Sequence, residues 1–162
     1  MSKWVTAWGI PTSYAVEGIG NLMEDTTFRN IFYSPIKGEK VRIRFTNKYG
    51  EDDVKLDAVS IAEWAGSGPV IIPETLKTIT LNENGNIIKA GEELVTDAIE
   101  FDIEPGKDYV LSYYFKDLTR ISTGYNKSPG SNISQCWLGR GNFVNEREVD
   151  LKKRRETITY TF

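Results

Sequence analysis

Apolar and polar residues alternate along KVRIRFTNKYG, residues 40–50. One face of an extended chain would be apolar and the other polar, which is typical of a half-buried strand. The inner positions would be Val41, Ile43 and Phe45, and the outer ones Arg42, Arg44 and Thr46. Turn-forming residues follow, from Asn47 to Gly50, and predict a hairpin in which residues 52–62 return beside this strand.

Similar strand patterns recur at short spacing along the chain. The main predicted strands lie at residues 4–9, 27–34, 53–64, 98–103, 109–115, 133–138 and 157–162. Within 53–64 the apolar phase shifts, which implies either a bulge or burial of both faces. Asn84-Gly85 predicts a second hairpin, between residues 78–81 and 87–89. Residues 146–155 could form a short helix or a solvated arm.

These patterns predict an all-β fold of about nine to eleven strands with almost no amphipathic helix. The expected architecture is an antiparallel β-sandwich, jelly-roll-like in its connections. The 162 residues fit a single domain spanning 1–162, because domains usually have about 100–200 residues. A chain of this size buries enough surface to fold without a metal or disulfide.

Charge and hydropathy exclude some partners. The net charge of −3 argues against a nucleic-acid surface. A basic run, Lys152 to Arg155, is surrounded by acidic residues and favours a self-compensated arm. The sequence shows no signal-peptide pattern and no apolar run long enough for a membrane helix, so we expect no membrane partner. The compartment stays open, cytoplasmic or secreted.

Residue types restrict the chemistry further. The chain has no histidine, which removes Ser-His and Cys-His catalysis and the usual imidazole metal sites. Ser67 and Ser128 lie in no nucleophile motif. Cys136, the one cysteine, has the character of an inert core thiol. Glu100 and Asp102 share one strand face and could be read as the carboxylate pair of a glycoside hydrolase, but an ordinary exposed strand face is favoured. We therefore expect no catalytic residue and no cofactor.

Two alternatives remain for ligands. Acidic residues at 24–25 and 51–53 could bind calcium, although their spacing matches no calcium loop and solvated carboxylates are favoured. Aromatic side chains could stack on sugar rings, although most should be core. Trp64, beside a glycine-rich loop, and Tyr125, in a long polar loop, are the better candidates for a carbohydrate site.

The stretch 41–50 resembles an Arg-x-Arg-(apolar)-(Ser/Thr)-Asn-x-(aromatic)-Gly element. That element belongs to the N-terminal β-sandwich domain of SGNH (GDSL-type) esterases and lipases. Further resemblances follow in matching order at Trp4 and Trp8, Thr27-Phe28-Arg29, Ile61-Ala62, Gly91 with Thr96-Asp97, and Gly106 to Tyr113. They cover about residues 4–115 well and the remainder loosely.

The resemblance implies a non-catalytic accessory domain of an esterase acting on acylated carbohydrate or lipid-like esters. Such a domain would pack beside the catalytic SGNH domain of the same polypeptide and shape substrate access. The family's Gly-Asp-Ser block and late Asp-x-x-His pair are absent from this chain and are expected downstream, so no catalytic residue carries over. The alternative is a stand-alone carbohydrate-binding module.

Within that motif we expect each residue type to have a structural role. Arg42 and Arg44 should pair with acidic neighbours or with a partner domain. Asn47 can bond its own turn backbone, Tyr49 can cap the end of the sandwich and Gly50 closes the bend.

Overall fold

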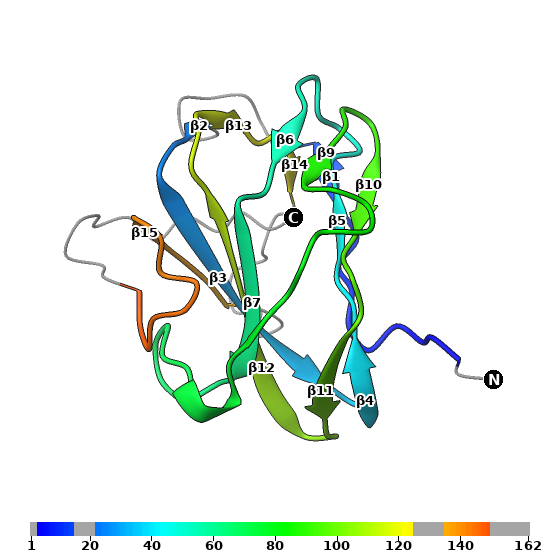
Figure 1. The fold of residues 1–162 in the computed structure, drawn as a ribbon, viewed down its shortest axis with the longest axis vertical. Helices are drawn as coiled ribbons and strands as arrows, with labels where there is room; N and C mark the ends of the chain where they lie inside the picture. Colours follow the sequence, from blue (N-terminus) through cyan, green and yellow to red (C-terminus); the bar gives the residue numbers. More distant parts are fainter. Residues whose placement is uncertain (1–2, 15–21, 125–134, 150–162) are drawn as a thin grey trace.

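The fold is an antiparallel β-sandwich (Figure 1). The computed structural model describes residues 3–14, 22–124 and 135–149. All strand pairs in this part are antiparallel, and apart from a 3-10 turn at Pro73–Thr75 it contains no helix. The predicted all-β class and antiparallel pairing are confirmed.

The larger layer is a five-stranded sheet in the order β15-β3-β12-β7-β8. Its strands are β15 (Gln135–Arg140), β3 (Thr26–Ser34), β12 (Lys107–Phe115), β7 (Ala58–Glu63) and β8 (Lys77–Thr78). The nine-residue strands β3 and β12 pair along their whole length, from Lys107 opposite Ser34 to Phe115 opposite Thr26. They form the centre of the sheet.

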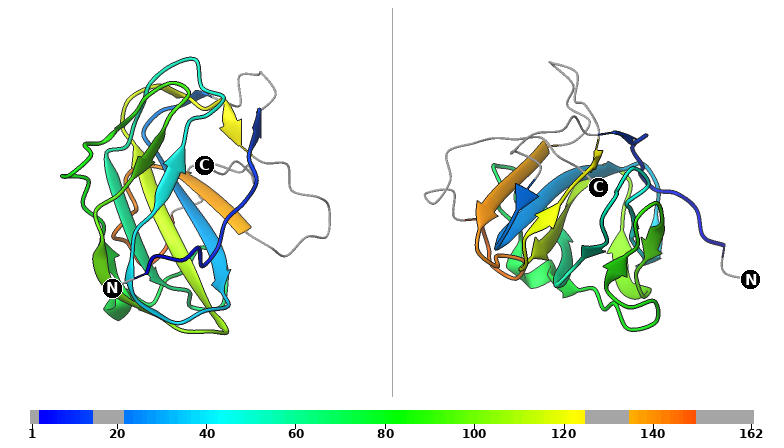
Figure 2. Two further views of the ribbon diagram at one scale, coloured as in Figure 1. Left: turned by 90° about the vertical axis from the view of Figure 1, so that its right-hand side faces the viewer. Right: turned by 90° about the horizontal axis from the view of Figure 1, so that it is seen from above.

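Shorter strand pairs build the facing layer and one end (Figures 1 and 2). The facing pairs are β4 (Gly38–Val41) with β11 (Ile99–Ile103), β5 (Arg44–Thr46) with β10 (Glu93–Val95), and β6 (Val54–Lys55) with β9 (Ile87–Ile88). The end pairs are β1 (Ser13–Tyr14) with β14 (Thr123–Gly124) and β2 (Leu22–Met23) with β13 (Thr119–Arg120). The described residues thus hold fifteen strands, more than predicted, because long predicted strands are divided.

The predicted strand at 40–46 is divided at Arg42 and Ile43 into β4 and β5. Ile43 donates its N–H to Thr96 Oγ1 at 2.9 Å, and Thr96 returns its own N–H to the Ile43 carbonyl at 2.9 Å. A side-chain hydroxyl therefore replaces one ladder bond and interrupts the strand. The predicted alternation survives, since Val41 and Phe45 are buried while the two arginines are exposed.

Both predicted hairpins are wrong. Strand β5 pairs with β10, β6 pairs with β9, and β7 pairs with β12 and β8. Residues 59–62 are buried on both faces, as one reading of the phase shift predicted, so β7 belongs inside the larger sheet. The chain therefore crosses between layers instead of folding back locally, as in a jelly roll.

The predicted first strand at 4–9 is also wrong, because this segment forms no strand. A side-chain contact holds it instead: the rings of Trp8 and Phe32 lie 5.6 Å apart. The predicted strands at 27–34, 98–103 and 109–115 are confirmed as β3, β11 and β12, and 133–138 in its described part as β15. Residues 146–149 are not helical, and the basic run and the strand at 157–162 lie outside the described residues.

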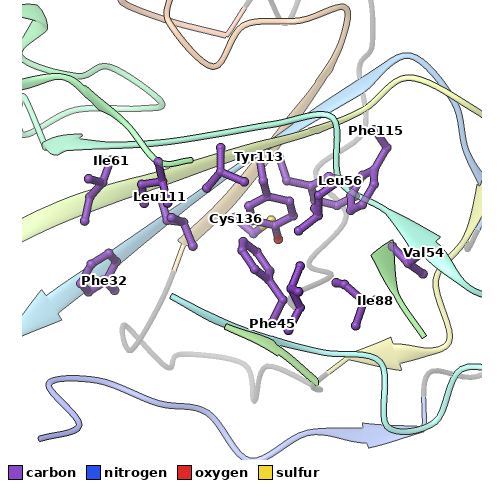
Figure 3. Packing of buried hydrophobic residues seen from close by; sticks show 14 of the residues in the cluster. Phe32, Phe45, Val54, Leu56, Ile61, Ile88, Leu111, Tyr113, Phe115 and Cys136 are labelled. Atoms are coloured by element: carbon purple, nitrogen blue, oxygen red, sulfur yellow. The ribbon is translucent and has the colours of Figure 1, made fainter. Parts of the chain in front are cut away.

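Aromatic rings fill the space between the layers (Figure 3). Phe28 and Tyr113, from neighbouring strands, stack with centroids 5.4 Å apart, and Phe45 from the facing layer meets Tyr113 edge-on at 5.5 Å. Each buried aromatic side chain contributes about 1.5–3 kcal/mol. Cys136 is buried in the same core, as predicted.

The outer face of the larger sheet carries a different kind of core, centred on Arg29. This residue of β3 is fully buried. Its guanidinium donates five hydrogen bonds of 2.5–3.2 Å, to Ser112 Oγ and to the carbonyl oxygens of Pro69, Phe143, Glu146 and Arg147. Burial lowers the pKa of Arg29 to about 10, an effect that the nearby Glu146 carboxylate opposes. The side chain therefore stays charged at neutral pH.

Residues 141–147, which we call the strap, lie on this outer face. Thr27 and Ser60 bond to them in addition to Arg29. Thr27 Oγ1 donates to the Gly141 carbonyl and accepts from the Phe143 N–H. Ser60 Oγ donates to the Val144 carbonyl. The strap therefore covers part of the outer face of the larger sheet, with side chains from two of its strands bonded to it.

We expect Arg29→Met to lower the free energy of unfolding by about 3–5 kcal/mol, because buried carbonyl oxygens of the strap would lose their donors. Urea denaturation measures this change. The matched control is Arg44→Met, whose exposed pair with Glu93 should be worth about 0–1 kcal/mol. Equal losses in the two variants would contradict the role given to Arg29.

Candidate functional site

Three cations point outward from the strand region that the sequence singled out. Lys40 pairs with Glu100 at 2.6 Å, and this hydrogen bond raises the pKa of Lys40. Arg44 pairs with Glu93 at 2.9 Å. Arg42, between them, has its guanidinium carbon 4.3 Å from the centre of the Trp4 ring.

Arg42 differs from its two neighbours in the kind of partner it has. Within the described ranges it forms no ion pair, and its contact is with an aromatic face. A cation over an exposed indole gains about 0.5–1 kcal/mol. This contact leaves the N–H edges of the guanidinium available for a planar, bidentate acceptor such as a carboxylate.

The ring that Arg42 covers belongs to an exposed segment. Trp4 is 42% exposed and Val5 is 57% exposed. The segment runs beside β4 and β5, outside the smaller layer (Figure 2). Trp8, four residues on, packs instead against the core. Trp4 and Arg42 together form an apolar and cationic surface spot, which we call the Trp4–Arg42 pair.

Sequence reasoning singled out Arg42 as a site residue and missed Trp4. The sequence predicted a strand at 4–9 and treated most aromatic side chains as core, and it gave no local signal that distinguishes Trp4 from Trp8. Only the structure separates a half-buried Trp8, packed against the core, from an exposed Trp4.

Of the two aromatic residues proposed for a carbohydrate site, Trp64 does not lie at the Trp4–Arg42 pair. Trp64 is half-buried, and its Nε1 donates to the Gly68 carbonyl at 2.9 Å. Its ring packs with Ile31, Ala62 and Val110, on the opposite side of the molecule from Arg42. Tyr125 lies outside the described residues.

Asn47 connects the loop after β5 to neighbouring segments. It is fully buried, and its Nδ2 donates to the carbonyls of Asp52 at 2.9 Å and Ile88 at 3.3 Å. Its own carbonyl accepts the N–H groups of Gly50 and Gly91. The bond to Asp52 agrees with the expected turn role, while the bonds to 88 and 91 join the loop to the β9–β10 region.

Tyr49 and Gly50 complete this loop. Tyr49 is half-buried, and its N–H donates to Thr123 Oγ1 at 2.9 Å, which ties the loop to the end of the sandwich. A Cβ atom at Gly50 would lie 1.9 Å from Asn47 Oδ1. Residue 50 therefore has to be glycine for reasons of space next to the Asn47 amide.

Three of the five acidic residues considered for calcium are engaged with cations. Asp53 pairs with Lys89 at 2.7 Å, Asp52 lies 3.5 Å from Arg120, and Asp25 lies 3.8 Å from Arg140. Among the described residues, no cluster of three or more metal-ligating side chains was found. Asp25 also accepts a hydrogen bond from Tyr114; burial and this bond raise the pKa of Tyr114 to about 12.

An open hollow lies elsewhere, beside β9 and β10. Its lining is Asn84, Gly85, Asn86, Ile87, Lys89, Glu92, Glu93, Leu94 and Val95. The lining contains no aromatic side chain, so it lacks the flat ring on which a sugar would stack. The hollow does not include the Trp4–Arg42 pair.

Asp97 holds the segment that was predicted to form the second hairpin. Its carboxylate accepts hydrogen bonds from Thr80 Oγ1 and from the N–H groups of Asn82 and Glu83. These bonds lower the pKa of Asp97 below its usual value. They fix residues 80–83 as a loop, which explains why β8 and β9 do not pair.

No family model matches this chain, and no curated protein matches it. In the part of the chain that the structure describes, no helix has the length and hydrophobicity to cross a membrane.

We expect Gly50→Ala to destabilise the fold by about 1–3 kcal/mol, because the added methyl group overlaps the buried Asn47 amide. Thermal unfolding measures the effect. Gly38→Ala is the control, since a Cβ there would have its nearest neighbour at 3.9 Å. If both variants melt alike, the steric account of Gly50 is wrong.

Stability should fall with acid in a way that depends on Asp97. The unfolded chain, with a usual pKa near 3.8, takes up a proton before the folded chain does as the pH falls. The stabilisation is therefore complete above the unfolded pKa and is lost as the pH falls through the lower folded pKa.

Asp97→Asn should be less stable at neutral pH and should show a shallower loss below about pH 4. Denaturation midpoints measured from pH 7 to pH 2.5 test this. Asp102→Asn, on the exposed face of β11, is the control and should keep the wild-type profile. An unchanged acid profile in Asp97→Asn would exclude the Asp97 carboxylate as its source.

Proposed function

We propose that this chain is a non-catalytic accessory domain of an SGNH-type ester hydrolase that acts on acylated carbohydrate or lipid-like esters. It packs beside the catalytic domain of the same polypeptide and shapes the approach of the substrate. The resemblance over about residues 4–115 supports this proposal, as does the lack of histidine in the sequence.

The observation that carries the proposal is the Trp4–Arg42 pair. Tryptophan and arginine are the residue types most enriched at the energetic centres of protein interfaces. Here they stack on each other outside the smaller layer, and Trp4 remains 42% exposed. The opposite side of the sandwich is partly covered by the chain's own strap. The exposed pair therefore indicates that a partner would bind on the side of β4 and β5.

A stand-alone carbohydrate-binding module is the second candidate. The exposed indole of Trp4 favours it, because such rings stack on sugars. In that case the fluorescence of the tryptophans should change with soluble glycans, and Trp4→Ala should abolish the change. A flat titration across a panel of glycans would remove this candidate.

Hydrolysis assays test the first candidate. We expect the hydrolase lacking residues 1–162 to lose about tenfold or more in kcat/KM on a polymeric acylated carbohydrate, equivalent to ~1.4 kcal/mol. A small soluble ester such as p-nitrophenyl acetate should be affected much less, because it needs no shaped approach. Equal activity with and without the segment on both substrates would overturn the proposal.

A further inference from the structure

We propose that the Trp4–Arg42 pair is the centre of the contact with the catalytic domain, and that Arg42 receives a carboxylate from that domain. This inference rests on the proposed function, because it specifies how the partner is recognised. It commits to one occupant, a protein surface with an acidic side chain among apolar groups.

The charges around the pair indicate the sign of the partner. Lys40 is neutralised by Glu100 of the paired strand β11 at 2.6 Å, and Arg44 by Glu93 of the paired strand β10 at 2.9 Å. Arg42 makes no such ion pair within the described residues and stacks on a neutral ring. Of the three cations Lys40, Arg42 and Arg44, one therefore lacks an anionic partner among the described residues, and a single carboxylate would complement it.

The geometry of the pair indicates the chemistry of the contact. The indole under Arg42 restricts the guanidinium plane, so less conformational entropy is lost when its N–H edge binds a carboxylate. Trp4 and its neighbour in sequence, Val5, are both exposed and give apolar area to bury. Burial of that area would exclude water from the ion pair and strengthen it.

The rest of the molecule offers a poorer surface. The strap covers part of the outer face of the larger sheet, where Arg29 is buried with its five donors satisfied. The hollow beside β10 is lined largely by polar side chains, and one of these, Lys89, already pairs with Asp53. Neither place combines an exposed aromatic ring with an available cation.

The test uses hydroxyl-radical footprinting of the complete polypeptide and of residues 1–162 alone. Oxidation of Trp4 should slow several-fold when the catalytic domain is present. Arg42→Ala and Arg42→Lys should restore fast oxidation, since lysine keeps the charge but not the planar fork. Arg44→Ala, which breaks a neighbouring exposed pair, should leave the slow rate unchanged.

The same variants are assayed on the polymeric ester. Arg42→Ala and Trp4→Ala should reproduce most of the loss seen without residues 1–162, while Arg44→Ala should not. If the segment is needed for hydrolysis but Trp4 is equally reactive in both forms, this inference is overturned and the proposed function stands. If hydrolysis is independent of the segment, both fail.

Discussion

The structure depends on a positive charge that lies inside it. Placing a guanidinium in a site without water is costly unless every donor is satisfied. Arg29 meets this condition with five hydrogen bonds, four of them to backbone carbonyls. Because carbonyl oxygens come from Pro69 and from the strap, segments about 40 and more than 110 residues away along the chain must reach the same point. The cation thus dictates how the outer face is covered.

This requirement explains the two-sided burial of the larger sheet. On the inner side, β3 and β12 present aromatic rings to the facing layer. On the outer side the same strands present Arg29 and Ser112, which are bonded to each other at 2.9 Å. Apolar contact organises the inner face, whereas the outer face combines a second apolar cluster around Ile31 and Val110 with the directional hydrogen bonds of Arg29. The inner face gains stability from area, whereas the outer face fixes which loops lie where.

The covered outer face also has a consequence for the surface of the molecule. With the strap bonded to one side, the Trp4–Arg42 pair is displayed on the other, beside two neutralised cations. The two arginines differ in their partners. The buried Arg29 donates to backbone carbonyls, whereas the exposed Arg42 lies over the Trp4 ring.

The sequence by itself determined which residues form the main strands and, for residues 41–46 and β11, which side faces inward. Alternation identified β3 and β11, and it placed Phe45 inside and Arg42 and Arg44 outside, while a high β-propensity identified β12. Side-chain periodicity depends on the backbone alone, so it can be read locally. The tertiary structure alone decided which strands pair, since both local hairpins lost to pairings with distant strands. It also decided that Arg29 is buried among carbonyls from remote loops. Likewise, it left Trp4 exposed while the half-buried Trp8 packs against the core. Those outcomes depend on groups far away along the chain, and a local pattern contains no information about them.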